Sequence, residues 1–202
     1  MGKPRKPETP HYLGGHFLIS EVELLDPNFF RTVVLLISHD AEGAFGLVVN
    51  RKSEITLEDL MEGVSDTAAA DLPIFVGGPV QQEYLFVVHS GLPAGVSSGH
   101  ENETAAGVIF EPATAPLITY LTEEWSELPV EDRPRLHLYA GYSGWGGGQL
   151  ERELQEEAWV VLKASGDIVF HPHPELGWKD ALSRKGPFYK IVAETGFKPS
   201  MN

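Results

Sequence analysis

Short apolar runs separated by turn-forming residues recur along this chain, and they predict a protein built largely from β-strands. The clearest run, residues 31–38, is rich in β-branched and aliphatic side chains, which is typical of a strand buried on both faces. A five-residue turn joins it to the run 44–50, so these two segments are expected to form a hairpin. The other predicted strands cover residues 15–20, 72–80, 83–90, 134–141, 158–165 and 167–171.

Helical periodicity or helix-end signals mark four further segments. Residues 56–64 place their apolar side chains on one face, and Thr56 with Asp59 forms a capping pattern at the start. Residues 115–125 repeat apolar side chains every four positions. A third helix is expected to begin near Gln149, and a fourth to cover residues 174–186. Residues 91–107 are expected to form a long polar loop, and residues 187–202 a short strand and tail.

The order of these elements favours an α+β fold. Strands outnumber helices, most sequence neighbours are expected to be antiparallel, and the regular strand–helix alternation of a doubly wound sheet is missing. Residues 1–11 are basic and proline-rich, and we expect them to be a disordered tail. Residues 12–202 are expected to form one domain, a length that can enclose a single hydrophobic core.

The negative charge is concentrated in the middle of the chain. Residues 53–132 contain 15 Asp and Glu but no Lys or Arg, whereas the formal net charge of the whole chain is −14. Nucleic-acid binding depends on Lys and Arg side chains that contact phosphates. The charge pattern therefore disfavours a nucleic-acid partner, and a solvated acidic surface is its simplest explanation.

Cysteine and long apolar segments are both missing from the sequence. Without cysteine the chain has no disulfide, no thiolate zinc site and no cysteine nucleophile. The first apolar run is short and is followed at once by Glu21 and Glu23, which argues against a signal peptide. No apolar run approaches the ~20 residues of a membrane span. We therefore expect a soluble cytoplasmic protein with no membrane partner.

The segment AGYSGWGGGQLERELQEEAW, which begins at Ala140, is rich in glycine but lacks the residues that glycine-loop chemistry requires. A phosphate-binding loop would need a lysine where Gly147 stands, and a dinucleotide fingerprint would need a glycine at Gln149 or Glu151. A nucleophile elbow fails because Trp145 replaces its last glycine. Carboxylates in the first turns of the following helix would repel a bound phosphate. The segment is therefore predicted to be a tight connection between a strand and a helix.

Other polar residues give weaker signals. His171 and His173 could both contact a metal, but two ligands do not make a site, and no metal or cofactor is predicted. Glu151 and Glu153 do not share a helix face, so they form a poor acid–base pair. A buried Glu153 would need hydrogen-bond partners, and we expect this side chain to be solvated.

Several of these stretches resemble the YqgE/AlgH family of small bacterial proteins. The resemblance is carried by GHFLIS, DPNFFRTVVLLISHDAEGAFGLVVNR, VGGPV, LFVVHS, AGYSGWGGGQLERELQEEAW and the closing PSMN, and it covers nearly all of residues 13–202. It implies an α+β fold with a mixed, mostly antiparallel sheet curled into a pseudo-barrel with a few flanking helices. It implies no established enzymatic activity, although some members carry a transcriptional-regulator label. The matching polar and aromatic residues form the candidate binding set: Arg31, His39, Asn50, Arg51, His89, Tyr142, Trp145, Gln149, Glu151 and Glu153.

Three functional hypotheses follow. The leading one is a non-enzymatic cytoplasmic protein that binds a protein partner or a small ligand, with Tyr142 and Trp145 supplying contact area near the glycine-rich segment. One alternative is a hydrolase-type enzyme that uses His39 or His89 with Glu153 or Ser143, which requires these groups to lie within hydrogen-bond reach. The other, transcriptional regulation, is disfavoured by the acidic charge and by the lack of a helix-turn-helix signal.

Overall fold

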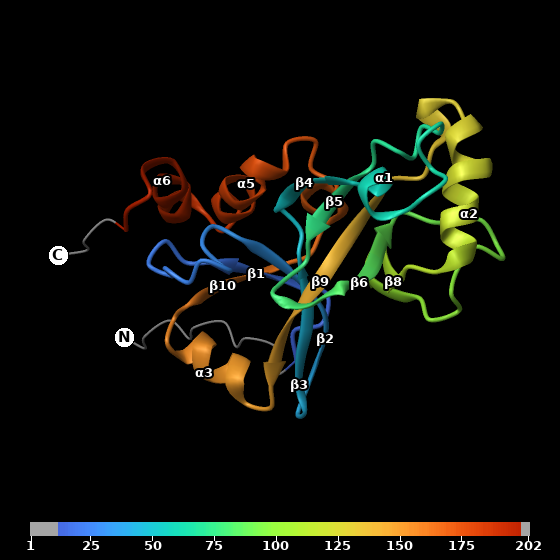
Figure 1. The fold of residues 1–202 in the computed structure, drawn as a ribbon. Coiled ribbons are helices and arrows are strands. Elements are labelled where there is room, and N and C mark those ends of the chain that lie inside the picture. Colours follow the sequence, from blue (N-terminus) through green and yellow to red (C-terminus); the bar gives the residue numbers. More distant parts are fainter. Residues whose placement is uncertain (1–11, 199–202) are drawn as a thin grey trace, which may run out of the picture.

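The computed structural model describes residues 12–198, and a ten-stranded sheet runs through its centre (Figure 1). The strands are β1 (His16–Ser20), β2 (Val33–Asp40), β3 (Gly43–Val48), β4 (Lys52–Thr56), β5 (Pro73–Val76), β6 (Val80–His89), β7 (Asn102–Ala105), β8 (Val108–Pro112), β9 (Leu136–Gly146) and β10 (Trp159–Lys163). The helices are α1 (Leu57–Leu60), α2 (Ala115–Glu123), α3 (Gln149–Gln155), α4 (Gly166–Val169), α5 (Gly177–Ser183) and α6 (Pro187–Thr195), with the 3-10 turns η1 (Trp125–Glu127), η2 (Val130–Asp132) and η3 (Pro174–Leu176).

The long strand β9 joins the two ends of this sheet. One edge of β9 pairs antiparallel with β6, from Val80 opposite Tyr142 to His89 opposite Leu136. The other edge is shared, because β5 runs parallel to residues 138–140 and β3 runs antiparallel to residues 143–146. The main strand order β10–β1–β2–β3–β9–β6–β8–β7 therefore carries a side branch of β5 and β4, and the sheet divides at β9.

At the first end of the molecule, strands β10, β1, β2 and β3 lie between two helical layers. Figure 1 shows α5 and α6 on one side of these strands and α3 on the other. Trp178 and Val192 from α5 and α6 join Phe17 in one core cluster, whereas Leu150 from α3 joins Trp145 in another. Both faces of these strands are covered, which explains why β2 is an almost continuous apolar run.

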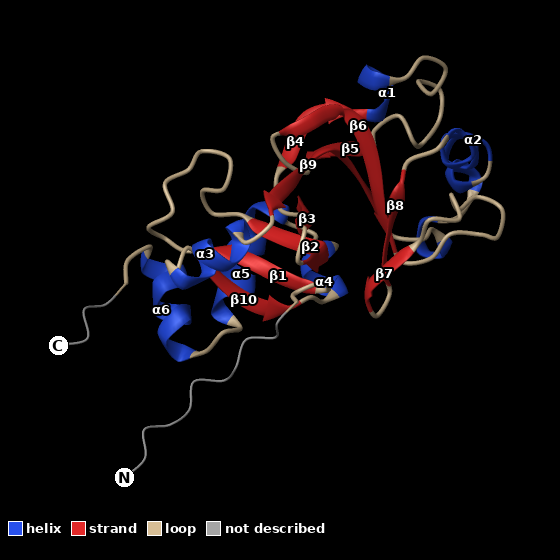
Figure 2. Ribbon diagram, turned by 90° about the horizontal axis from the view of Figure 1, so that it is seen from below, coloured by secondary structure: helices blue, strands red, loops and turns tan. Residues whose placement is uncertain are grey.

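The second end of the molecule is built on β5, β6 and the first half of β9. Its core contains Leu117 and Leu121 of α2, together with Val87 and Leu138 from the sheet. Helices α1 and α2 lie at this end, away from α3, α5 and α6 (Figure 2). Strands β5 to β8 and both of these helices fall within residues 53–132, so the acidic residues gather at this end.

The glycine-rich segment is mostly strand, because β9 continues as far as Gly146. Only Gly147 and Gly148 connect it to α3, and Gly148 has a left-handed φ of 72°. The strand also passes very close to the turn after β5, where a Cβ on Gly78 would lie 2.2 Å from the backbone of Tyr142. No larger residue fits there. The expected close packing is confirmed, although the connecting loop is shorter than predicted.

Most of the predicted elements are present, and the α+β fold with a curled, mostly antiparallel sheet is confirmed. The predicted hairpin is β2 and β3, and a bulge interrupts its register between Leu36 and Ser38. The predicted capping pattern is also present, since the backbone N–H of Thr56 donates to Asp59 Oδ2 at 2.8 Å. The helix it begins, α1, is only one turn long and ends at Leu60.

Two predictions near the C-terminal end were wrong. Residues 167–171 do not form a strand, because α4 covers Gly166–Val169 and buries Ile168 and Val169. An apolar run this short has no periodicity that could distinguish a helix from a strand. Residues 187–195 form α6 instead of a short strand. The signals for α6 were Pro187 at its first turn and Gly196, with a φ of 75°, just after its end.

Three strands were missed. Strand β8 and its edge partner β7 form a hairpin inside and just after the predicted polar loop, and β4 follows β3 directly. Strand β7 pairs on one side only, so most of its side chains can be polar. The predicted tail at residues 1–11 and the closing PSMN motif lie outside the described residues.

Candidate functional site

The ten residues of the candidate set do not line one cleft. Arg31 and Asn50 lie at one end of β2 and His39 at the other. His89 lies at the end of β6, opposite Leu136 of β9. Tyr142 of β9 lies opposite Val80, at the start of β6. The side chains therefore fall into separate groups, and each group has its own internal partners.

Glu153 of α3 is the centre of the first group. Its Oε2 accepts the indole N–H of Trp145 at 2.9 Å and of Trp159 at 2.8 Å, and its Oε1 accepts the side-chain amide of Gln149 at 2.9 Å. Phe29 stacks on the indole of Trp145 and contacts that of Trp159 edge-on. The expectation of a solvated Glu153 was wrong, because two buried indole N–H groups need an acceptor. Trp145 is only 6% exposed and offers no contact area to a partner.

His39 and Glu151 form the second group, next to the first. The Nδ1 of His39 accepts the backbone N–H of Leu13 at 3.1 Å, so its other ring nitrogen carries the proton. That nitrogen, Nε2, lies 3.1 Å from Glu151 Oε1. The histidine side chain is 1% exposed and that of Glu151 is 40% exposed. The pair fixes the residues before β1 against α3.

His89 repeats this arrangement at the other end of the molecule. Its Nδ1 accepts the backbone N–H of Gly91 at 3.2 Å, and its Nε2 donates to Glu111 at 2.9 Å. Burial lowers the pKa of His89, against the opposing effect of Glu111. Burial also raises the pKa of Glu111, but hydrogen bonds from Ser98 and Ser97 outweigh it and the net pKa is lowered. A neutral imidazole thus faces a buried carboxylate.

Arg31, Asn50 and Arg51 hold the turn before β2. The amide of Asn50 accepts the backbone N–H of Val33 at 2.7 Å and donates to the carbonyl of Arg31 at 3.0 Å. The guanidinium of Arg51 donates to the carbonyl of Asn28 at 2.9 Å. Arg31 itself has a left-handed φ of 52° and places its guanidinium beside the ring of Trp178. These contacts hold the turn before β2 in place and leave no indication of a binding role.

Tyr142 belongs to an aromatic cluster inside the curled sheet. Its ring centroid lies 4.8 Å from that of Phe45 and 6.2 Å from that of Phe86, and the side chain is half-buried.

The side-chain pairs that a hydrolase would need are not formed. Ser143 is fully buried and donates to the carbonyl of Gly77 at 3.1 Å, and within residues 12–198 neither His39 nor His89 bonds to it or to Glu153.

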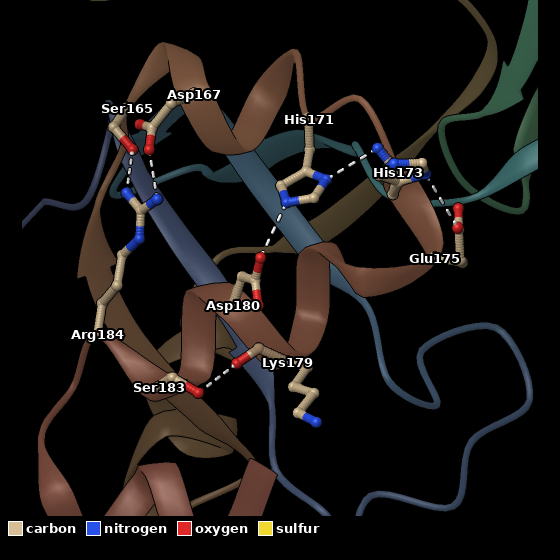
Figure 3. A network of polar contacts seen from close by, with 9 residues as sticks. All are labelled: Ser165, Asp167, His171, His173, Glu175, Lys179, Asp180, Ser183 and Arg184. Atoms are coloured by element: carbon tan, nitrogen blue, oxygen red, sulfur yellow. Dashed lines mark hydrogen bonds and ion pairs between the residues drawn. The ribbon is translucent and has the colours of Figure 1, made fainter. Parts of the chain in front are cut away.

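The two histidines of the HPHP segment also have internal partners (Figure 3). The Nε2 of His171 lies 2.9 Å from Asp180 Oδ2, and its Nδ1 accepts the backbone N–H of His173 at 3.0 Å. Both ring nitrogens of His171 are therefore engaged in holding η3 and α5. Within the described chain no three His, Asp or Glu side chains come together in a possible metal-binding group.

A cleft at the free edge of β10 holds the most unusual polar group of the molecule. Strand β10 is the last strand of the main sheet order, and the cleft beside it has a volume of about 400 Å³. Helix α3 supplies one wall, and α6 with the turn before it supplies the other. The lining residues are Glu21, Leu154, Glu157, Trp159, Val160, Val161, Lys185, Phe188, Tyr189 and Lys198.

Glu21 lies in this cleft and is only 4% exposed. It follows β1 directly, and its backbone N–H donates to the carbonyl of Ala158 at 3.0 Å, which extends the pairing with the start of β10. Its Oε1 accepts the hydroxyl of Tyr189 at 3.0 Å. Its buried Oε2 has no hydrogen-bond partner within residues 12–198. The ammonium of Lys198 is 3.2 Å from this oxygen, at ion-pair distance but without hydrogen-bond alignment.

Tyr189 and Lys185 complete the polar lining. Burial, the charge of Glu21 and the hydrogen bond to it raise the pKa of Tyr189 to about 12, so the phenol stays protonated and remains a donor. The ammonium of Lys185 donates to the carbonyl of Val161 at 2.7 Å and covers the outer edge of β10. No sequence motif marks these residues, although the sequence holds one signal, an acidic residue directly after an apolar strand.

The comparisons with known proteins agree with this architecture. The family model DUF179, described as AlgH-like, matches residues 17–190. The chain belongs to the AlgH-like family. Two relatives described only as UPF0301 proteins are similar over most of their length. The one from Streptomyces avermitilis is 36% identical over 190 residues, covering 94% of this chain and 95% of the relative. The one from Thioalkalivibrio sulfidiphilus is 37% identical over 181 residues, covering 88% and 91%.

Two solved structures share the AlgH-like fold. The solution structure of the AlgH protein from Pseudomonas aeruginosa superposes with a TM-score of 0.69 at 32% identity, covering 93% of this chain and 96% of that one. A crystal structure from Corynebacterium diphtheriae also has a TM-score of 0.69, at 22% identity and 94% coverage of both chains. The resemblance seen in the sequence is therefore confirmed, and the names of these AlgH-like relatives assign no activity. No helix among residues 12–198 is both long enough and apolar enough to cross a membrane.

Proposed function

We propose that this protein is a non-enzymatic binding protein that takes a small ligand in the cleft between α3, β10 and α6. The observation that carries the proposal is Glu21, a buried carboxylate whose Oε2 accepts no hydrogen bond within residues 12–198 and is met only by the ion-paired ammonium of Lys198. An unsatisfied buried polar atom costs roughly 1–3 kcal/mol, so a protein retains one where something else supplies the missing bond.

The shape and lining of the cleft support a small ligand. Pockets for small molecules commonly have volumes of roughly 300–1,000 Å³, with apolar walls and a few placed polar groups. This cleft has about 400 Å³, and its walls include Leu154, Val161 and Phe188. Its polar groups are the Glu21–Tyr189 pair at the base, Glu157 and two lysines.

The described polar groups favour binding over catalysis. A nucleophile activated by a neighbouring base is the usual mark of a covalent or hydrolytic site. Here the histidines at positions 39 and 89 each use both ring nitrogens for structural contacts, and Ser143 is sealed in the sheet. We further place the protein in the cytoplasm, a proposal that its lack of cysteine supports.

Ligand-observed NMR with a library of small charged and neutral compounds tests the cleft. Compounds that bind the wild type should lose their signal with Leu154→Trp, which fills the cleft from the α3 wall. They should keep it with Leu60→Trp, a matched change at an exposed leucine of α1 in the acidic end. Both variants are first checked for a wild-type amide spectrum. If Leu154→Trp binds the same compounds as the wild type, the cleft is not the site.

A further inference from the structure

The unsatisfied oxygen of Glu21 also indicates which class of ligand the cleft takes. We propose that the cleft binds a primary ammonium group carried on an aliphatic chain, and that Lys198 holds this position in the unliganded protein. The inference rests on the proposed function and names its ligand class.

The base of the cleft calls for a hydrogen-bond donor. A carboxylate only accepts hydrogen bonds, and one oxygen of Glu21 already accepts the hydroxyl of Tyr189 at 3.0 Å. The other oxygen is buried and has no hydrogen-bond partner in the described chain. A bound acid or phosphate would bring further acceptors to this point and be repelled. A cationic donor satisfies both the charge and the hydrogen-bonding capacity of Oε2, which Lys198 meets only at ion-pair distance.

Lys198 shows that this position accepts an ammonium on a four-carbon stem. Its Nζ is 3.2 Å from Glu21 Oε2 and 3.6 Å from Glu23 Oε2, and its side chain is 24% exposed. The residue lies just beyond the end of α6, where Gly196 takes a left-handed φ of 75°. A lysine loses up to ~2 kcal/mol of side-chain entropy when it is immobilised. A free amine loses translational freedom as well, so it displaces Lys198 only through better alignment with Oε2 and burial of its own aliphatic chain.

The other charges of the cleft agree with a cation. Lys185 is already engaged with the carbonyl of Val161 at 2.7 Å, and Glu157 adds a second carboxylate to the lining. Once Lys198 has moved away, the two carboxylates outnumber the remaining lysine by one.

The apolar walls account for the aliphatic part of the ligand. Leu154 and Val161 line the cleft from α3 and β10, and Phe188 lines it from α6. These side chains offer nothing to a hydrated inorganic cation, but they can cover methylene groups at about 0.8 kcal/mol per buried CH₂. An alkylammonium ligand uses both features of the cleft, its walls and its carboxylate.

The test is a titration followed by amide NMR, using n-pentylamine and 1,5-diaminopentane as probes. A blocked lysine amide is added as a probe, and 1-pentanol and pentanoate serve as neutral and anionic controls of similar length. The amines should shift amides around Glu21, Val161 and Tyr189, and the alcohol and the acid should not. Tighter binding of the free diamine indicates a small-molecule source of the ammonium, and tighter binding of the lysine amide indicates a protein side chain.

Two variants separate ligand recognition from folding. Lys198→Met removes the internal ammonium and keeps the stem, so amine affinity should rise by about tenfold as competition is lost. Glu21→Gln keeps an acceptor for Tyr189 but removes the charge, and amine binding should disappear even in the Lys198→Met background. Matched changes at exposed positions of α6, Lys190→Met and Glu194→Gln, should leave the affinity unchanged.

The outcomes also distinguish this inference from the proposed function. If Lys198→Met folds normally and binds no amine, or if Glu21→Gln binds amines as well as the wild type, the ammonium assignment is overturned. Neutral or anionic compounds that still bind and are lost with Leu154→Trp would then leave the cleft as a binding site for another class of ligand. Equal binding of every compound to wild type and Leu154→Trp would remove both proposals.

Discussion

The two ends of the molecule contain the same histidine–glutamate arrangement in different surroundings. His39 and His89 each accept a backbone N–H at Nδ1 and contact a glutamate through Nε2. At the acidic end, the side chains of His89 and Glu111 are 1% and 2% exposed, whereas Glu151 at the other end is 40% exposed. Equal hydrogen-bond geometry therefore does not mean equal stabilisation, because solvent screens the exposed pair and the surrounding strands enclose the buried one.

The largest effect is expected when the buried pair is broken. Glu111→Ala leaves the Nε2–H of His89 and the N–H of Ser98 without an acceptor inside the protein. Each buried donor left without an acceptor costs about 1–3 kcal/mol, so the two together should lower the free energy of unfolding by about 2–6 kcal/mol. Urea denaturation measures this loss, and Glu103→Ala on the exposed edge strand β7 is the matched control, expected to be nearly neutral. A loss below about 1 kcal/mol would mean that the two pairs are equivalent after all.

The second prediction concerns pH and a histidine between the two ends. Burial lowers the pKa of His137 on β9 to about 4, where its ring stacks on Phe75 with centroids 4.4 Å apart. The folded state holds this ring neutral, but the unfolded chain takes up a proton below its pKa of about 6.5. Stability is therefore complete above pH 6.5 and falls towards pH 4, by about 3 kcal/mol for this shift. The lowered pKa of His89 acts in the same direction.

Urea denaturation at a series of pH values from 7 to 4 measures this dependence. His137→Phe should remove most of the slope, since a phenyl ring can stack on Phe75 but cannot take up a proton. His100→Phe, an exposed position, serves as the control and should keep the wild-type profile. An unchanged slope in His137→Phe would show that other groups govern the acid response.

The smallest expected effect is the difference in free energy of unfolding between variants of two glutamates of α3. Glu153→Ala leaves the indole N–H groups of Trp145 and Trp159 without their shared acceptor, and the free energy of unfolding should fall by about 2 kcal/mol. Glu151→Ala, at the half-exposed pair with His39, should cost about 1 kcal/mol or less. Chemical denaturation monitored by tryptophan fluorescence compares them. The opposite order would mean that the pair with His39 is the principal anchor of α3.

Much of the fold could be predicted because its strands carry local signals. The run 31–38 predicted β2, and the run 44–50 predicted β3. Gly46 lets the backbones of these two strands approach closely, since a Cβ there would lie 2.7 Å from the carbonyl oxygen of Leu35. Helix α6 also had local signals, since Pro187 marks its start and Gly196 its end. A strand was predicted there because these helix-end signals were given too little weight. Strand β7 had none, since its side chains are half-buried or exposed.

The site was harder to predict because burial of a polar group depends on tertiary packing. Glu153 looked like one more acidic residue of an amphipathic helix, and only the fold brings Trp145 and Trp159 to it. Glu21 stood at the end of an apolar run, but its partners Tyr189 and Lys198 are almost the whole chain away. The resemblance to a family identified matching residues, and most of these hold the fold together.

The shared strand β9 also has a consequence for how the chain can fold during synthesis. Both cores draw on it: β5 and β6 pair with its first half, and β3 pairs with its second. The first end needs β10 as well, which places His16 opposite Lys163. The second core cannot close until residues up to 142 have left the ribosome, and the first cannot close until residues up to 163 have followed. The long-range contacts therefore form late in synthesis. For the same reason, no single cut would divide this protein into two halves that fold independently.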